Sequence, residues 1–172
     1  MQRYSSALGG LFITLPRGAL PDTRVVSVAL MRRAPSTVFD FVTTPVHWPV
    51  WHPSSSSVHG EIDHSLEVGE QVIEEFRVAG RRGRVVWTVS VSTYPEKWSI
   101  DGVIDGRPAG TVTYVLTPQG NGTRFVREFT YRISSLWFAL LDWIVLKTTI
   151  QSESDVAATR LKRMLENMPT AP

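Results

Sequence analysis

The sequence predicts an α+β domain in which a curved antiparallel β-sheet of about seven strands wraps around one long C-terminal helix. Three observations lead to this prediction. Residues 135–167 contain no Gly or Pro and stop just before Pro169, which is typical of one uninterrupted helix. Residues 58–133 alternate apolar and polar side chains in short segments separated by turn residues, which is typical of antiparallel strands. A β-branched segment and two short helical segments precede them.

The expected elements follow one another in a simple order. The first strand covers 23–32, where three valines favour extended backbone. A short helix begins at Pro35, because proline suits the first helical turn, and it ends before Pro45. A second short helix or turn is expected within 45–56, followed by a serine-rich loop. The remaining strands are expected at 58–63, 71–78, 84–94, 97–104, 110–118 and 123–133.

The length and composition suit one soluble domain. The chain has 172 residues, enough for a core of its own. We assign residues 23–167 to the domain, 1–22 to an N-terminal arm and 168–172 to a tail. The absence of cysteine excludes disulfides and thiol catalysis and favours a cytoplasmic location. No apolar run reaches the roughly 18 residues that a transmembrane segment needs, and a net charge of +2 does not indicate binding to nucleic acid.

Alternation along the strands predicts which side chains face the interior. The inner face is expected to carry a set of aromatic residues, namely Trp87, Trp98, Tyr114, Phe129 and Tyr131. Arg127 falls on this same face. An arginine is rarely buried without a partner, so two roles are considered for Arg127. It forms an internal ion pair, for which Glu75 is the candidate, or it anchors a carboxylate or phenolate of a ligand.

The C-terminal helix carries an apolar stripe that is bulky at its ends and small in the middle, at Ser154 and Ala157. Small side chains opposite a concave sheet leave room for a cavity, unless Trp87 and Trp98 fill it. The first half of the helix has a second apolar face that something else must cover. The N-terminal arm, a membrane surface or a second copy in a homodimer would do so, through Trp137, Leu141 and Ile144.

The remaining candidate motifs do not indicate a specific function. The basic cluster 81–84 is expected in a hairpin turn, where a solvated turn is favoured over a phosphate-binding role. The four histidines, His47, His52, His59 and His64, lack the spacing of a recognisable metal site. Glycine-rich nucleotide-binding loops and nucleophilic serine motifs are missing from the sequence. We therefore expect no metal and no cofactor.

Several segments together resemble a known superfamily. They are Ala34–Phe41, Trp48–Pro53, Leu66–Glu70, Thr117–Thr123 and Leu161–Glu166. Their order and spacing over residues 23–167 resemble the SRPBCC superfamily, which includes START domains and birch-pollen allergens, and look closest to its polyketide cyclase/dehydrase-like branch. The resemblance implies a helix-grip fold with a hydrophobic cavity. Members bind lipids, polyketides, quinones, steroids or hormones, and a minority catalyse cyclisation or dehydration. They share no catalytic set, so no catalytic residue is assigned.

The expected function is therefore the binding or carriage of a small hydrophobic molecule, such as a lipid or polyketide. The expected binding residues are Trp51, Trp87, Trp98, Tyr114, Arg127, Phe129, Tyr131, Ser154 and Ala157. The alternative is a polyketide cyclase or dehydrase that works by acid–base chemistry in the same cavity. In that case Arg127 and Tyr114 or Tyr131 would polarise carbonyl groups, and His52 or Glu75 would move protons.

Overall fold

The computed structural model of the protein describes residues 22–131 and 140–169, and the side chains of its last helix from residue 147 onward. Its elements, in chain order, are β1 (Thr23–Met31), α1 (Pro35–Thr43), the 3-10 helix η1 (Pro45–His47), α2 (Trp48–Trp51), β2 (Ser55–His59), β3 (Gln71–Val78), β4 (Arg81–Thr93), β5 (Lys97–Ile104), β6 (Arg107–Gln119), β7 (Gly122–Tyr131) and α3 (Leu140–Asn167).

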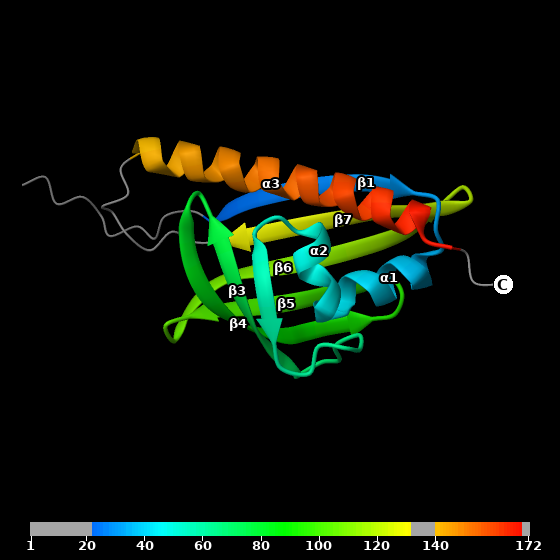
Figure 1. Ribbon diagram of the computed structural model, residues 1–172, viewed down its shortest axis with the longest axis horizontal. Coiled ribbons are helices and arrows are strands. Elements are labelled where there is room, and N and C mark those ends of the chain that lie inside the picture. The colour runs from blue at the N-terminus through cyan, green and yellow to red at the C-terminus, as the bar shows by residue number, and fades with distance from the viewer. Residues whose placement is uncertain (1–21, 132–139, 170–172) are drawn as a thin grey trace, which may run out of the picture.

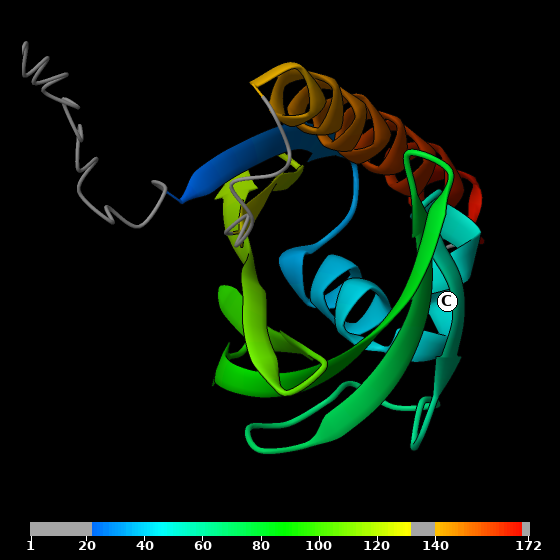
Figure 2. The same ribbon diagram turned by 90° about the vertical axis from the view of Figure 1, so that its left-hand side faces the viewer.

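The strands form one antiparallel sheet in the order β1-β7-β6-β5-β4-β3-β2. The sheet curls into a half-barrel, α3 packs along β1 at its edge, and α1 and α2 lie within the curl (Figures 1 and 2). The predicted α+β helix-grip fold is confirmed, including the seven strands and the two short helices after the first strand.

The predicted inner face of the sheet is also confirmed. On β4, Val85, Trp87 and Val89 are buried, and the matching positions of β5, β6 and β7 are buried as well, except Phe129, which is half-buried. Val91 departs from the pattern and is only half-buried. The ladder between β4 and β5 shifts register between Val89 and Val91, and such a bulge interrupts the alternation of side chains.

Several predicted boundaries are wrong. The basic cluster 81–84 was expected in a hairpin turn, but β4 begins at Arg81, and β6 begins at Arg107 and not at residue 110. The serine run was expected to be a loop, but β2 covers Ser55–His59 and pairs with β3. Ser54 and Ser55 are buried, because this short edge strand lies over the end of the core. The strand expected at 58–63 therefore begins earlier, at Ser55, and ends at His59. Serine has little preference for strands, so the run of serines does not mark this start.

The antiparallel order sorts the connections to two ends of the barrel. The β3–β4 and β5–β6 hairpins lie at the end where β7 finishes and α3 begins (Figure 1). The β2–β3 loop and the β4–β5 and β6–β7 turns lie at the opposite end, together with α1. There, Nε of Arg33 donates a hydrogen bond to the carbonyl oxygen of Leu165 over 2.6 Å, which joins the start of α1 to the end of α3.

The second apolar face of the long helix lies outside what the structure describes. Trp137 falls in the gap between β7 and α3, and the side chains of Leu141 and Ile144 belong to the undescribed first turns of α3. The predicted arm at 1–22 lies almost entirely outside the described residues too. What covers this face therefore remains a prediction.

Candidate functional site

A cavity of about 290 Å³ lies inside the half-barrel. Its walls come from the inner face of the sheet, the segment around α2, and one side of α3. The sheet contributes aromatic and aliphatic side chains, including Phe76, Trp87, Tyr114, Phe129 and Tyr131. Trp48 and Trp51 close one side, and Ile150 and Ser154 of α3 close another. Native cores rarely contain voids much larger than a water molecule, so this space is a pocket and not a packing fault.

Seven of the nine predicted binding residues line this cavity. They are Trp51, Trp87, Tyr114, Arg127, Phe129, Tyr131 and Ser154. Trp98 and Ala157 are fully buried but belong to the surrounding core. The indole of Trp98 stacks on the ring of Tyr114 with 5.4 Å between centroids, and its Nε1 donates a hydrogen bond to the carbonyl oxygen of Leu66 over 3.1 Å. Trp98 therefore supports the cavity wall from behind.

Arg127 is the central polar residue of the site. Its side chain is buried, and Nη1 donates a hydrogen bond to Oγ of Ser154 over 3.1 Å. The guanidinium carbon lies 5.7 Å from the ring centre of Phe129, at cation–π distance. Tyr114 lies opposite Arg127 on the neighbouring strand. Among the described residues, no carboxylate forms a salt bridge with Arg127.

The prediction that Glu75 forms an ion pair with Arg127 is wrong. Glu75 accepts a hydrogen bond from Nη2 of Arg84 over 2.9 Å and another from Oγ of Ser57 over 3.1 Å, on the outer face of the sheet. Its neighbour Glu74 faces inward and lines the cavity. Two adjacent glutamates differ by one position in the alternation of a strand, and one position changes the face. Phe76 and Val78, which also line the cavity, mark the correct phase in the sequence.

Glu74 places a carboxyl group in this apolar space. It accepts a hydrogen bond from Nε1 of Trp87 over 2.7 Å. Burial raises the pKa of the Glu74 carboxyl, while hydrogen bonds from Ser55 and Trp87 and the positive charge of Arg127 oppose that rise. The cavity thus holds an acid and a cation that do not form a direct salt bridge.

Gly102 leaves the space that the indole of Trp87 occupies. A Cβ atom on Gly102 would lie 2.6 Å from Cζ3 of Trp87, which is too close for two carbon atoms. The indole therefore lies flat across the backbone of β5, and this position lets its Nε1 reach Glu74. Glycine within a strand often marks such a close approach.

Some buried polar atoms around the cavity find no hydrogen-bond partner among the described residues. They include Nε1 of Trp51, Nε2 of His52 and Nε of Arg127. Burial, together with the charge of Arg127, lowers the pKa of His52 well below 6.5, so its imidazole is neutral at physiological pH. An unpartnered buried polar group costs about 1–3 kcal/mol. These atoms would be satisfied by water or by polar atoms of a bound molecule.

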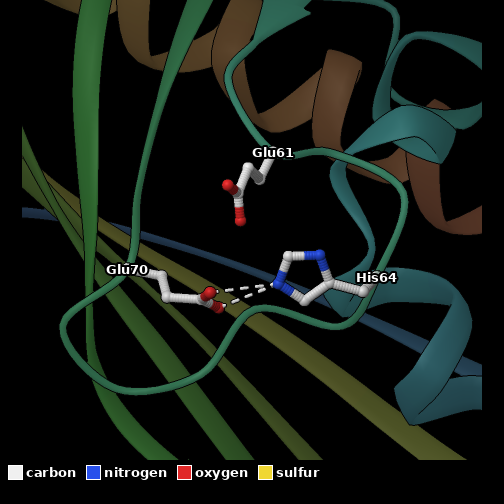
Figure 3. Close-up of side chains that lie close together, drawn as sticks. All are labelled: Glu61, His64 and Glu70. Carbon is white, nitrogen blue, oxygen red and sulfur yellow. Dashed lines mark hydrogen bonds and ion pairs between the residues drawn. The ribbon is translucent and has the colours of Figure 1, made fainter.

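A second group of titratable side chains lies away from the cavity, in the β2–β3 loop. Ligand atoms of Glu61, His64 and Glu70 lie within 4.8 Å of one another (Figure 3). Nε2 of His64 lies 3.1 Å from Oε1 of Glu70, and Glu70 also accepts a hydrogen bond from the backbone of Glu67 over 2.6 Å. Sequence spacing did not predict this convergence. The contacts describe an ion pair that closes the loop.

The fold and cavity define a helix-grip protein with an internal, mainly apolar binding space. The chain belongs to the family described as "Polyketide cyclase / dehydrase and lipid transport", whose model matches residues 22–166. The resemblance to the SRPBCC superfamily is thereby confirmed. No curated protein matches the sequence. Among the described residues, no helix is both long and apolar enough to cross a membrane.

Solved structures agree with this fold. A Chromobacterium violaceum protein superposes with a TM-score of 0.65 at 14% identity, over 84% of this chain and 98% of that one. A Thermus thermophilus protein gives a TM-score of 0.66 at 15% identity, over 83% and 97%. Ara h 8.0201 gives 0.59 at 10% identity, over 84% and 98%. At these identities the similarity shows the fold alone.

Proposed function

We propose that this protein binds and carries a small, mainly apolar molecule in the cavity between the sheet and α3. The observation that supports this most strongly is the cavity itself, about 290 Å³ and lined mostly by aromatic and aliphatic side chains. Ligand pockets combine such walls with a few placed polar groups. The family description, which includes lipid transport, supports the same kind of ligand.

The polar groups suggest how the molecule is oriented. Arg127, Tyr114 and Trp51 can donate hydrogen bonds, and Glu74 can accept one. Burial raises the pKa of Tyr114 to about 12, so this phenol remains protonated and keeps its donor. These groups gather around the Trp51–Tyr114 contact, where the ring centroids are 6.4 Å apart. We infer that a ligand places its one polar end there and its apolar body against Trp87 and Phe129.

The test is to look for the molecule directly. The protein is purified from its own host and measured by native mass spectrometry, and separately titrated with the neutral fluorophore aminoanthracene. The proposal expects a co-purified small molecule, or saturable binding of the fluorophore with a blue-shifted emission. If a molecule co-purifies, it should displace the fluorophore. A protein that carries nothing and does not bind the fluorophore would reject the proposal.

A second candidate function is cyclisation or dehydration of a polyketide, and Glu74 is the observation that favours it. A carboxyl group with a raised pKa in a pocket is a candidate acid or base. Arg127 and Tyr114 would donate hydrogen bonds to a ketone oxygen, while Glu74 would take a proton from the adjacent carbon. Glu74→Gln keeps the acceptor for Trp87 but removes the proton transfer. An unchanged cyclisation rate for a poly-β-ketone would reject this function, and a lost rate with retained binding would support it.

A further inference from the structure

Arg81 lines the cavity at one end of the half-barrel, and further exposed arginines follow it on the same hairpin. Val78 and Arg81 from the β3–β4 hairpin and Ala109 from β6 line the cavity at the end where the two hairpins lie. Figure 2 looks onto this end of the half-barrel. Residues 77–84 contain four arginines and no acidic residue. We call the five exposed arginines of these two hairpins the basic rim: Arg77, Arg81, Arg82, Arg84 and Arg107. Of these, Arg84 is paired with Glu75, and Arg107 shares its hairpin with the exposed Asp101 and Asp105.

The basic rim includes two like charges in direct apposition. Arg77 of β3 lies directly opposite Arg82 of β4 in the ladder. Like charges at such positions destabilise a β-sheet. Among the described residues, neither side chain forms a salt bridge with a carboxylate. Within the described part of the chain, this repulsion in the β3–β4 hairpin is not relieved by a carboxylate, and an anionic partner would relieve it.

The loop at the opposite end has the reverse charge. The β2–β3 loop, residues 60–70, contains Glu61, Asp63, Glu67 and Glu70 and no lysine or arginine. The net charge of the whole chain is only +2. The basic rim thus reflects the placement of charge and not a general excess. A negative surface would attract the hairpin end and repel the acidic loop, which turns the cavity entrance toward that surface.

We propose that the basic rim docks the cavity entrance on an anionic lipid surface. The inference rests on the proposed function, because an apolar cargo held in the cavity has its natural source and destination in a lipid phase. Arginines pair strongly with phosphate groups, and each basic residue near an anionic membrane contributes about fivefold to binding. Val78, half-buried between Arg77 and Arg81, adds an apolar contact at the tip of the hairpin.

The test uses the full chain with vesicles of phosphatidylcholine, with and without phosphatidylglycerol, in a sedimentation assay. The protein is expected to bind only the anionic vesicles, and the binding is expected to weaken as salt is added. Arg77→Gln with Arg82→Gln should weaken that binding about 30-fold. Its melting temperature should be equal to or above that of the wild type, because the repulsion between the two strands is removed.

The matched control is Arg160→Gln with Arg163→Gln. This variant removes two exposed charges near the C-terminal end of α3, away from the two hairpins. It should bind anionic vesicles like the wild type. Equal binding to neutral and anionic vesicles, or equal losses in the two double variants, would overturn docking by the basic rim, as would an absence of vesicle binding. Aminoanthracene binding without vesicles is measured in parallel. If it persists in all variants while vesicle binding fails, the docking inference alone is wrong; if it is absent from the wild type, the proposed cavity function is wrong.

Discussion

Arg127 of β7 donates a hydrogen bond from Nη1 to Oγ of Ser154 in α3, with 3.1 Å between the two atoms. Both residues are buried, Ser154 at 1% and Arg127 at 7% exposure. The bond therefore links the sheet to the long helix at the wall of the cavity. It also explains the small residue that interrupts the apolar stripe of α3, since a larger apolar side chain would leave this part of the guanidinium without an acceptor.

Ser154→Ala should lower the free energy of unfolding by about 1–3 kcal/mol, because it leaves a buried charged donor without its partner. Urea unfolding followed by tryptophan fluorescence measures this change. Ser152→Ala is the matched control, since Ser152 is exposed on the same helix, and it should change stability by less than about 0.5 kcal/mol. Equal effects of the two substitutions would show that the Arg127–Ser154 bond contributes nothing to stability.

Gly102→Ala tests the support of Trp87. The added Cβ would lie 2.6 Å from Cζ3 of Trp87, so the indole must move and its 2.7 Å hydrogen bond to Glu74 must lengthen or break. Such overpacking costs about 1–3 kcal/mol. We expect a loss of stability and a changed near-ultraviolet circular dichroism spectrum. Val103→Ala, at the exposed neighbouring position, should leave that spectrum unchanged; if both spectra are the same as that of the wild type, Trp87 does not depend on Gly102.

The sequence predicted the fold well because the strand alternation and the long helix without Gly or Pro are strong periodic signals. It also predicted that Trp87, Arg127 and Ser154 would lie around one cavity, because inner-face position and helical spacing follow from backbone geometry. It failed to predict that Glu74, and not Glu75, faces the cavity. With two adjacent glutamates, only the neighbouring residues of β3 show which of the two positions points inward. Proximity across the sheet, as between Trp87 and Gly102, depends on the register, and no local pattern contains that information.

Trp98 and Ala157 show a different limit. Both lie on the predicted inward faces and are fully buried, but neither lines the cavity. Alternation tells which side of a strand faces inward, and it does not tell how far a neighbouring ring covers that side. Tyr114 stacks on Trp98, and Trp51 contacts the same tyrosine. Distinguishing core from cavity wall therefore requires the packed side chains.

Val112→Phe tests whether the cavity is open space. Val112 is buried on β6 and lines the cavity, so a phenyl ring there would extend into a volume of about 290 Å³. We expect aminoanthracene binding to be lost while the free energy of unfolding is unchanged or raised, since filling a void adds contacts. Val115→Phe, at a half-buried position on the opposite face of β6, should retain binding. A loss of about 1–3 kcal/mol in Val112→Phe would instead indicate an already packed core.

The β2–β3 loop predicts a pH dependence that can be measured residue by residue. The hydrogen bond with Glu70, and then the contacts with Asp63, raise the pKa of His64 above 6.5 despite some desolvation. The backbone of Glu67, and then His64 itself, lower the pKa of Glu70 below 4.5. The contribution of His64 to stability is therefore fully present below pH 6.5 and is lost as the pH rises through its folded-state pKa. The contribution of Glu70 is present above pH 4.5 and is lost as the pH falls through its own folded-state pKa.

Both contributions overlap between pH 4.5 and 6.5, so the loop should be most strongly held in that window. Titration of the His64 ring protons by NMR should give a pKa above 6.5, and Glu70→Gln should lower it because the charged acceptor is removed. Glu67→Gln is the matched control: it removes a nearby charge but keeps the backbone donor to Glu70, so the His64 pKa should change far less. A His64 pKa that Glu70→Gln leaves unchanged would mean that the pair in Figure 3 does not hold the loop in solution, and the pH window predicted here would disappear with it.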